Sequence, residues 1–208
     1  MRGNTTEAWG GLTKTFHWLF VLLVAIVVPA GFLMQATFSM SLRHAETKPL
    51  HDVLAQVHHT LGFIMFALVL MRLGWRVKHP TPALPASLAT YQRWLARLTQ
   101  GALYALLILI PLSGWAALTS LADTAEYGKT QIWFFGTDSF PRIPFLEIKA
   151  PDDPTGYGRF GWLHRTLLMV GGVLLTLHVV GALWHHFVRK DRVLLRMLPD
   201  TSSAGPSS

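Results

Sequence analysis

Histidine is the residue type with the greatest capacity for chemistry in this 208-residue chain, which has ten histidines and no cysteine. Seven of the histidines lie within, or at the edge of, long segments that contain no Asp, Glu, Lys or Arg: His17, His58, His59, His164, His178, His185 and His186. Ionisable side chains are costly in an apolar environment, and there they mark functional sites. Imidazole is also the commonest protein ligand of metals. The pattern therefore predicts metal or cofactor binding in the apolar part of the chain.

The last of these segments has the most regular pattern. His164, Gly171, His178 and His185 follow one another at intervals of seven residues. Seven residues are nearly two helical turns, so these positions drift by only about 20° per step and share one face of a helix. His164 and His178 would lie about 21 Å apart along that helix. The spacing predicts two cofactors stacked across the helix, with Gly171 between them, where the backbone can approach the edge of a porphyrin.

Hydropathy predicts the elements that position these histidines. The chain is 51% hydrophobic and 14% charged, whereas a soluble domain is about a quarter charged. Four charge-free segments reach or exceed the roughly 18–20 residues that cross a hydrocarbon core: Thr15–Leu42, Val53–Met71, Leu98–Ala122 and Thr166–Val188. Buried helices of a large soluble core explain them poorly in a chain of 23.2 kDa.

The predicted fold is an all-α integral membrane four-helix bundle with up-down-up-down order, formed by residues 1–200. The spans lie near residues 15–38, 53–75, 95–120 and 162–188. The first is too long for the roughly 7–15-residue apolar region of a signal peptide, so we expect a retained span. Residues 123–160, rich in Gly and Pro, are predicted to form an outer loop or cap, and the Ser-rich tail 201–208 is predicted to be disordered.

Charge predicts the orientation of the bundle. The two termini and the loop 72–97 together carry 11 of the 18 Lys and Arg residues with only three acids, whereas the two opposite loops carry seven basic and eight acidic residues. Positive charge collects on the cytoplasmic side of membrane proteins. Both termini are therefore predicted to be cytoplasmic, in a multi-pass protein of the bacterial inner membrane in contact with membrane lipid. The excess of positive charge is explained by topology, and we expect no nucleic-acid partner.

This orientation sorts four histidines into two pairs at matching depths. His58 and His164 lie near the outer ends of the second and fourth spans, and His17 and His178 lie toward the cytoplasmic side of the first and fourth. Each pair predicts one haem with two axial histidines. His17 follows Lys14 by three residues, but His178 precedes Arg189 by eleven, so the fourth helix must tilt or overhang the cytoplasmic face.

Other interpretations of the histidines remain open at this point. His59 and His186 could be packing residues with hydrogen-bonded rings. A zinc or copper site would need ligands that converge on one point, whereas these histidines form two separated sets. The absence of cysteine excludes disulfides, Cys-ligated clusters and a covalently attached c-type haem.

Several motifs resemble the bacterial cytochrome b561 family. They are "TFHWLF" around His17, "VHHTLG" around His58, "LHRTLLMVGGVLLTLH" from Leu163 to His178, "RLGWRVKHPTPALP" after the second span, and "ALWHHFVRKDRVLLRMLP" up to Pro199. The resemblance covers most of the chain with the motifs in order. It implies two non-covalent b haems, with His17/His178 and His58/His164 as axial pairs.

The resemblance also implies quinone binding near the cytoplasmic haem, at His185–His186. His185 lies one heptad beyond His178 and could donate a hydrogen bond to a quinone. Together with Arg189, these two histidines form the predicted site for ubiquinone or another quinone, and we predict no separate catalytic residue. A set of interfacial side chains without a ligand is the alternative interpretation.

Three functions remain open from the sequence. The chain could be an oxidoreductase that carries single electrons between an outer donor, superoxide or a periplasmic redox partner, and the quinone pool. It could instead be a haem-bearing electron-transfer and anchor subunit of a partner enzyme, similar to the b subunits of hydrogenases and formate dehydrogenases. A non-redox structural or transport protein is the third reading. Lys48, Arg159 and Arg165, near the outer span ends, could pair haem propionates or attract a small anion such as superoxide. Ordinary solvated loop charge is the alternative interpretation.

Overall fold

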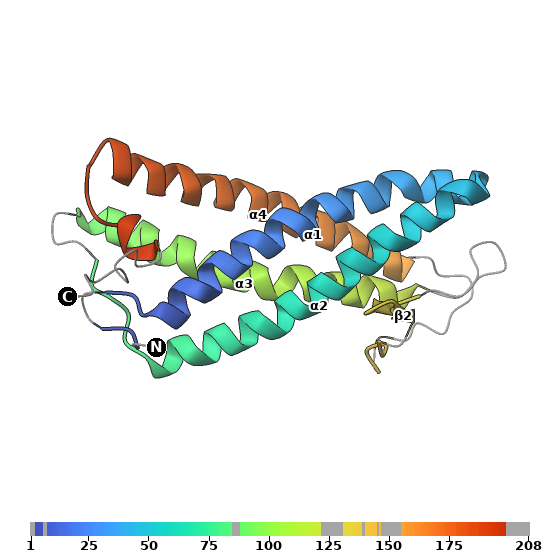
Figure 1. The fold of residues 1–208 in the computed structure, drawn as a ribbon, viewed down its shortest axis with the longest axis horizontal. Helices are drawn as coiled ribbons and strands as arrows, with labels where there is room; N and C mark the ends of the chain where they lie inside the picture. The colour runs from blue at the N-terminus through green and yellow to red at the C-terminus, as the bar shows by residue number, and fades with distance from the viewer. Residues whose placement is uncertain are drawn as a thin grey trace, which may run out of the picture.

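A computed structural model describes residues 3–5, 8–84, 88–121, 131–138, 140–144, 146 and 155–198. Four long helices dominate it: α1 (Gly11–Arg43), α2 (Lys48–Lys78), α3 (Thr90–Ser120) and α4 (Thr155–Phe187). Two short 3₁₀ helices, η1 (Ala45–Thr47) and η2 (Leu195–Met197), follow α1 and α4, and a hairpin of β1 (Trp133–Phe134) and β2 (Thr137–Asp138) lies between α3 and α4. Successive long helices run in opposite directions (Figure 1). The predicted all-α, up-down-up-down bundle is confirmed.

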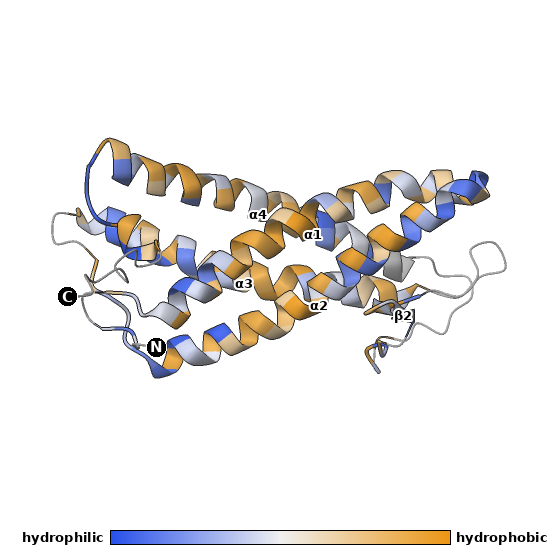
Figure 2. Ribbon diagram, in the orientation of Figure 1, coloured by the Kyte–Doolittle hydropathy of each residue, from blue (hydrophilic) through white to orange (hydrophobic). Residues whose placement is uncertain are grey.

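All four helices are long and apolar enough to cross a membrane. Each begins before its predicted span, and α1 and α2 also continue beyond theirs, because polar residues extend the helices past the apolar part. Apolar residues predominate along the middle of each helix, and polar residues gather toward the ends (Figure 2). Large apolar side chains face outward, such as Leu22 of α1 at 56% exposure and Leu98 of α3 at 69%. A soluble protein rarely exposes such a surface, so these side chains face lipid.

Each helix packs mainly on its neighbour in sequence. α1 packs on α2, α3 packs on α4, and α2 contacts α3. The core lies at the α1–α2 contact, where a stripe of α1 side chains at helical spacing meets two residues of α2: Phe16, Phe20, Leu23 and Val27 on α1, with Met65 and Val69 on α2. Among the described residues, α4 does not pack closely against α1 or α2. The bundle therefore consists of two helical hairpins that leave room between them.

The start of α1 and the end of α4 lie at one end of the bundle, and the β1–β2 hairpin lies at the other (Figure 1). Beyond its last turn, α4 is followed by a segment that returns toward α1, where the Trp18 indole N–H donates a 2.8 Å hydrogen bond to the Met197 carbonyl. The end of α4 thus overhangs the start of α1. This is the arrangement that the unequal distances of His17 and His178 from their flanking basic residues require. The tail 201–208 and much of the outer loop 123–160 lie outside the described residues.

Candidate functional site

The structure brings four histidines together as two pairs. The ring centroids of His17 on α1 and His178 on α4 are 6.3 Å apart, and those of His58 on α2 and His164 on α4 are 6.1 Å apart. Two imidazoles that bind one iron from opposite sides, each at roughly 2 Å, hold their centroids about 6 Å apart. Both pairs also connect helices whose backbones do not pack closely. The spacing and the room fit a flat cofactor between the rings of each pair.

The rings of the outer pair are oriented by backbone carbonyls of neighbouring helices. The Nδ1–H of His58 donates a 2.9 Å hydrogen bond to the Val27 carbonyl of α1, and the Nδ1–H of His164 donates a 2.8 Å bond to the Ile110 carbonyl of α3. A carbonyl only accepts hydrogen bonds, so the proton of each neutral ring is on Nδ1. Nε2 is then free to bind a metal, and the bond at Nδ1 fixes the plane of the ring.

A glycine makes room for each ring of the outer pair. A Cβ atom on Gly31 would lie 2.6 Å from Cε1 of His58, and one on Gly114 would lie 3.0 Å from Cε1 of His164. Each glycine follows by four residues the carbonyl that its histidine contacts, Val27 and Ile110 respectively. The two outer rings therefore rest on matching sites of α1 and α3.

The roles of these two glycines were not predicted from the sequence. A signal for them was present, because α1 contains "VVPAG" from Val27 to Gly31 and α3 contains "IPLSG" from Ile110 to Gly114. Pro29 lies in the first of these motifs and Pro111 in the second. In each motif the proline stands two or three residues before the glycine that the histidine ring contacts, and this shared pattern is the signal in the sequence.

The inner pair has different surroundings. No ring nitrogen of His17 or His178 has a hydrogen-bond partner within the described part of the chain. Among the charged side chains, Arg72 of α2 has the largest electrostatic effect on both rings. The two sites therefore differ in their fixed partners, a carbonyl for each ring at the outer site and a shared cation at the inner site.

His59 is adjacent to His58 but has a different contact. Its Nδ1 accepts a 3.4 Å hydrogen bond from the Trp133 N–H, and the next residue, Thr60, accepts one at 3.1 Å from the Phe135 N–H. Both donors belong to the β1–β2 hairpin and its turn. His59 thus attaches the hairpin to α2, which agrees with its interpretation as a hydrogen-bonded packing residue.

The three predicted quinone residues lie at the end of α4. The Nδ1–H of His185 donates a 2.6 Å hydrogen bond to the Asp191 carboxylate, while Arg189 lies 5.7 Å from the Trp184 ring centroid. His186 points elsewhere, since its ring meets Phe187 edge-on at 4.7 Å. The structure thus separates His185 from His186 and adds Asp191, which the sequence analysis missed although it lies six residues after His185.

Asp191 is ionised at neutral pH. Partial burial raises the pKa of its carboxyl, but the hydrogen bonds from His185 and from the Val193 N–H, together with the charges of His185 and Arg189, outweigh burial and lower the pKa. The contact with His185 is therefore present at neutral pH and is lost only as the pH falls through this lowered pKa.

The arrangement of donors argues against zinc. No group of three or more His, Cys, Asp or Glu side chains that could hold a metal ion exists among the residues that the structure describes. Zinc takes three or four protein ligands at one point. Two histidines facing each other instead suit a metal whose other ligands come from a macrocycle.

The similarity of the chain to known protein families also indicates which cofactor it binds. A model of the prokaryotic cytochrome b561 family matches residues 8–200, which is nearly the whole chain. The chain belongs to the prokaryotic cytochrome b561 family. It is therefore a haem-binding, multi-pass protein of a bacterial membrane that transfers electrons, as the sequence predicted.

Three b561 relatives resemble it along most of their length. Cytochrome b561 homolog 2 of Escherichia coli (strain K12) is 33% identical over 200 residues, covering 96% of each chain. Cytochrome b561 homolog 1 of the same strain is 28% identical, covering 88% of this chain and 92% of its own. A protein of Yersinia pestis named probable superoxide oxidase CybB is 26% identical, covering 88% of this chain and 91% of its own.

The space between the helical hairpins fits the haem of a cytochrome b561. A cleft of about 490 Å³ opens between α1 and α4, and its lining is almost entirely apolar: Val28, Phe32, Leu168, Met169, Gly172, Val173, Thr176 and Leu177. On α4 the cleft begins one turn after His164 and ends next to His178. Apolar walls at this level suit the hydrocarbon edge of a porphyrin.

Gly171 does not have the position that we predicted. A Cβ atom there would lie 3.4 Å from Cδ1 of Ile110, so this glycine packs on α3. Its neighbour Gly172 lines the cleft and has no atom within 4 Å of an added Cβ. The seven-residue spacing was sufficient to predict the histidines. It was not sufficient for Gly171, because at that level α3 packs on the same side of α4.

Proposed function

We propose that this cytochrome b561 holds two b haems, one between His17 and His178 and the other between His58 and His164. The observation that carries the proposal is the spacing of the two pairs, 6.3 and 6.1 Å between ring centroids. Each ring would bind iron through Nε2. At the outer site this agrees with the Nδ1 hydrogen bonds, which leave Nε2 free.

The two sites form a path for single electrons through the bundle. Iron with a histidine on both faces has no open position, so the haems supply reversible one-electron transfer and no oxygen binding. His164 and His178 set the distance between the sites, because both project from α4 and are about 21 Å apart along it. The apolar helix surfaces around the pairs keep water away from the path.

We further propose that both termini, and with them the His17/His178 site, lie on the cytoplasmic side. The support is the distribution of charge, with 11 of 18 basic residues and only three acids on that side. Fusion of a reporter enzyme that is active only in the cytoplasm should give activity after Leu198. Activity of a periplasm-specific reporter at that point would reverse the two faces.

The outer donor in this proposal is superoxide and the acceptor is ubiquinone. The support for superoxide is the name of the Yersinia relative, probable superoxide oxidase. Two superoxide ions would give two oxygen molecules and two electrons, and one quinone would take the two electrons and two protons to form quinol. In this proposal His185 would donate a proton to a quinone oxygen at the cytoplasmic end, and its hydrogen bond to Asp191 supports that role.

The test uses the purified chain with an enzymatic source of superoxide and a soluble ubiquinone analogue. We expect reduction of both haems and formation of quinol, both abolished by superoxide dismutase. The His58→Ala variant should lose quinol formation. Haems that accept electrons from dithionite but not from superoxide would contradict the superoxide assignment and favour the alternative, a haem-bearing subunit that receives electrons from a partner enzyme.

A further inference from the structure

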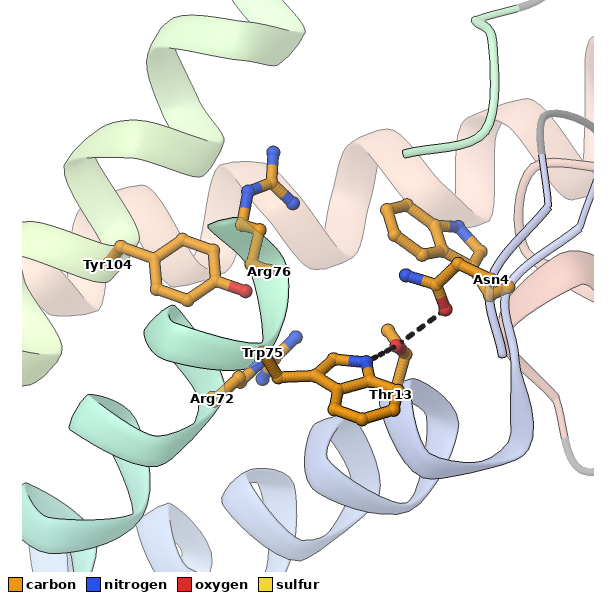
Figure 3. A pocket seen from close by; sticks show the side chains of 7 residues that line it. Asn4, Thr13, Arg72, Trp75, Arg76 and Tyr104 are labelled. Atoms are coloured by element: carbon orange, nitrogen blue, oxygen red, sulfur yellow. Dashed lines mark hydrogen bonds between the residues drawn. The ribbon is translucent and has the colours of Figure 1, made fainter. Parts of the chain in front are cut away.

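A polar pocket lies where α1, α2 and α3 meet the N-terminal segment (Figure 3). Its lining side chains are Asn4, Trp9, Thr13, Arg72, Trp75, Arg76 and Tyr104. The neutral groups bind one another: the Trp75 indole N–H donates to the Thr13 hydroxyl at 3.3 Å, and that hydroxyl donates to the Asn4 amide oxygen at 2.7 Å. Arg72 and Arg76 are the charged residues among these lining side chains.

Arg72 is the less satisfied of the two arginines. Its Nε is buried and has no hydrogen-bond partner within the described part of the chain. Its guanidinium lies 5.4 Å from the Phe20 ring centroid and 5.3 Å from that of Tyr104. Contact with aromatic faces stabilises a cation but leaves its N–H donors unused, and a buried donor without a partner is costly.

Arg76, one turn further along α2, shares the Tyr104 ring at 5.3 Å and donates a 3.3 Å hydrogen bond to Gln100. Neither arginine forms an ion pair with any acid among the described residues. The sequence explains this, because residues 72–97 contain no Asp or Glu. Two neighbouring guanidiniums without a carboxylate repel each other unless an anion joins them.

The position of Arg72 identifies the anion. Its guanidinium lies 5.4 Å from the ring centroid of Phe20, which follows His17 by three residues on α1. Thr13, four residues before His17, lines the same pocket. The charge of Arg72 also acts on the rings of both His17 and His178. A haem between these rings carries two propionate carboxylates on one edge. Guanidinium is the side chain best suited to bind a carboxylate, because its parallel N–H groups match the two oxygens.

We propose that Arg72, assisted by Arg76, binds the propionates of the inner haem. This contact would orient the porphyrin so that its propionate edge faces α2. The inference rests on the proposed haem between His17 and His178. The fixed positive charge beside the iron stabilises the reduced, less positive state. The inner haem should therefore have a higher midpoint potential than it would without the arginine.

The experiment is a redox titration of Arg72→Gln, with the inner midpoint identified as the one that His178→Ala lacks. We expect the inner midpoint to fall by the equivalent of about tenfold in the equilibrium constant, about 59 mV for one electron. The inner midpoint should also become pH-dependent, since an unpaired propionate takes up a proton on reduction. The midpoint of the outer haem should not change.

Two further variants serve as comparisons. Arg72→Lys keeps the positive charge, so the inner midpoint should fall less than in Arg72→Gln. Arg97→Gln, which removes an exposed arginine of α3, is the matched control and should show no fall.

Reconstitution with haem dimethyl ester separates propionate binding from a general effect of charge. Esterification removes the carboxylates, so Arg72→Gln should then change the inner midpoint much less than it does with ordinary haem. An equal shift with both haems would overturn the proposal, as would no shift with ordinary haem. A wild-type chain that binds fewer than two haems would contradict the proposed function itself. Two haems with an unchanged midpoint in Arg72→Gln would contradict only this inference.

Discussion

At the scale of single residues, the two histidine pairs are held in different ways. The outer rings are oriented by the carbonyls of Val27 and Ile110 and rest on glycines, whereas the inner rings share a nearby cation. Burial and the partners of Nδ1 tune a ligand's basicity and hence the potential of its metal. The two sites should therefore differ in midpoint potential although both use two histidines.

Gly31→Ala tests the support of the outer pair. The added Cβ would lie 2.6 Å from Cε1 of His58, so the imidazole must move, at a cost of roughly 1–3 kcal/mol. We expect loss of the outer haem or a shift of its midpoint, with the inner haem unchanged, as measured by haem content and redox titration. Gly101→Ala is the control, because its Cβ would meet no atom within 4 Å. Equal behaviour of the two variants would refute the role of Gly31.

Asp191→Asn tests the proposed proton path to a quinone. The amide keeps the shape of the side chain but removes the charge that orients His185. Loss of such a supporting contact typically slows a reaction about 10- to 100-fold, so reoxidation of the reduced haems by a ubiquinone analogue should slow by about this factor in stopped-flow measurements. Haem content should not change. Asp52→Asn, at the opposite end of the bundle, should reoxidise at the wild-type rate; an unchanged rate in Asp191→Asn would remove Asp191 from the path.

At the scale of elements, the β1–β2 hairpin is attached to the outer end of α2. In addition to the bonds to His59 and Thr60, Phe140 stacks on Phe63 of α2 with centroids 3.6 Å apart and meets Trp115 of α3 edge-on at 5.4 Å. The sequence predicted an outer cap but not this attachment. Contacts between residues about 75 positions apart in sequence leave no local pattern, and His59 was visible only as a second histidine beside His58.

Phe140→Ala should loosen this attachment. The ring is partly buried, so we expect a cost of about 2 kcal/mol, below the 3–5 kcal/mol of a fully buried phenylalanine. Local opening should then make the Trp133 amide exchange its hydrogen roughly 30-fold faster, with the helices unaffected. Phe135→Ala is the control, since that side chain is 70% exposed. If exchange at Trp133 is unaltered in Phe140→Ala, the hairpin is held by its hydrogen bonds alone.

At the scale of the whole molecule, hydropathy and charge-free length were sufficient to predict the four helices and their alternating order. Lipid requires every backbone group to bond within its own helix, so the apolar segments could form little else. The histidine pairs could be predicted from the seven-residue spacing along α4 and from the expected depth of each histidine in the membrane. The carbonyl partners, Gly31 and Gly114, Arg72 and Asp191 could not be derived in this way, because each depends on which faces of the helices meet.

The central claim is that two separate haems lie between two separate histidine pairs, and redox titration of single variants tests it most directly. The wild-type chain should bind about two haems and show two midpoints. His17→Ala and His178→Ala should lose the same midpoint, and His58→Ala and His164→Ala should lose the other. His59→Ala should keep both. If His17→Ala and His164→Ala lost the same midpoint, or if the wild-type chain bound one haem, the pairing and the electron path through the bundle would be contradicted.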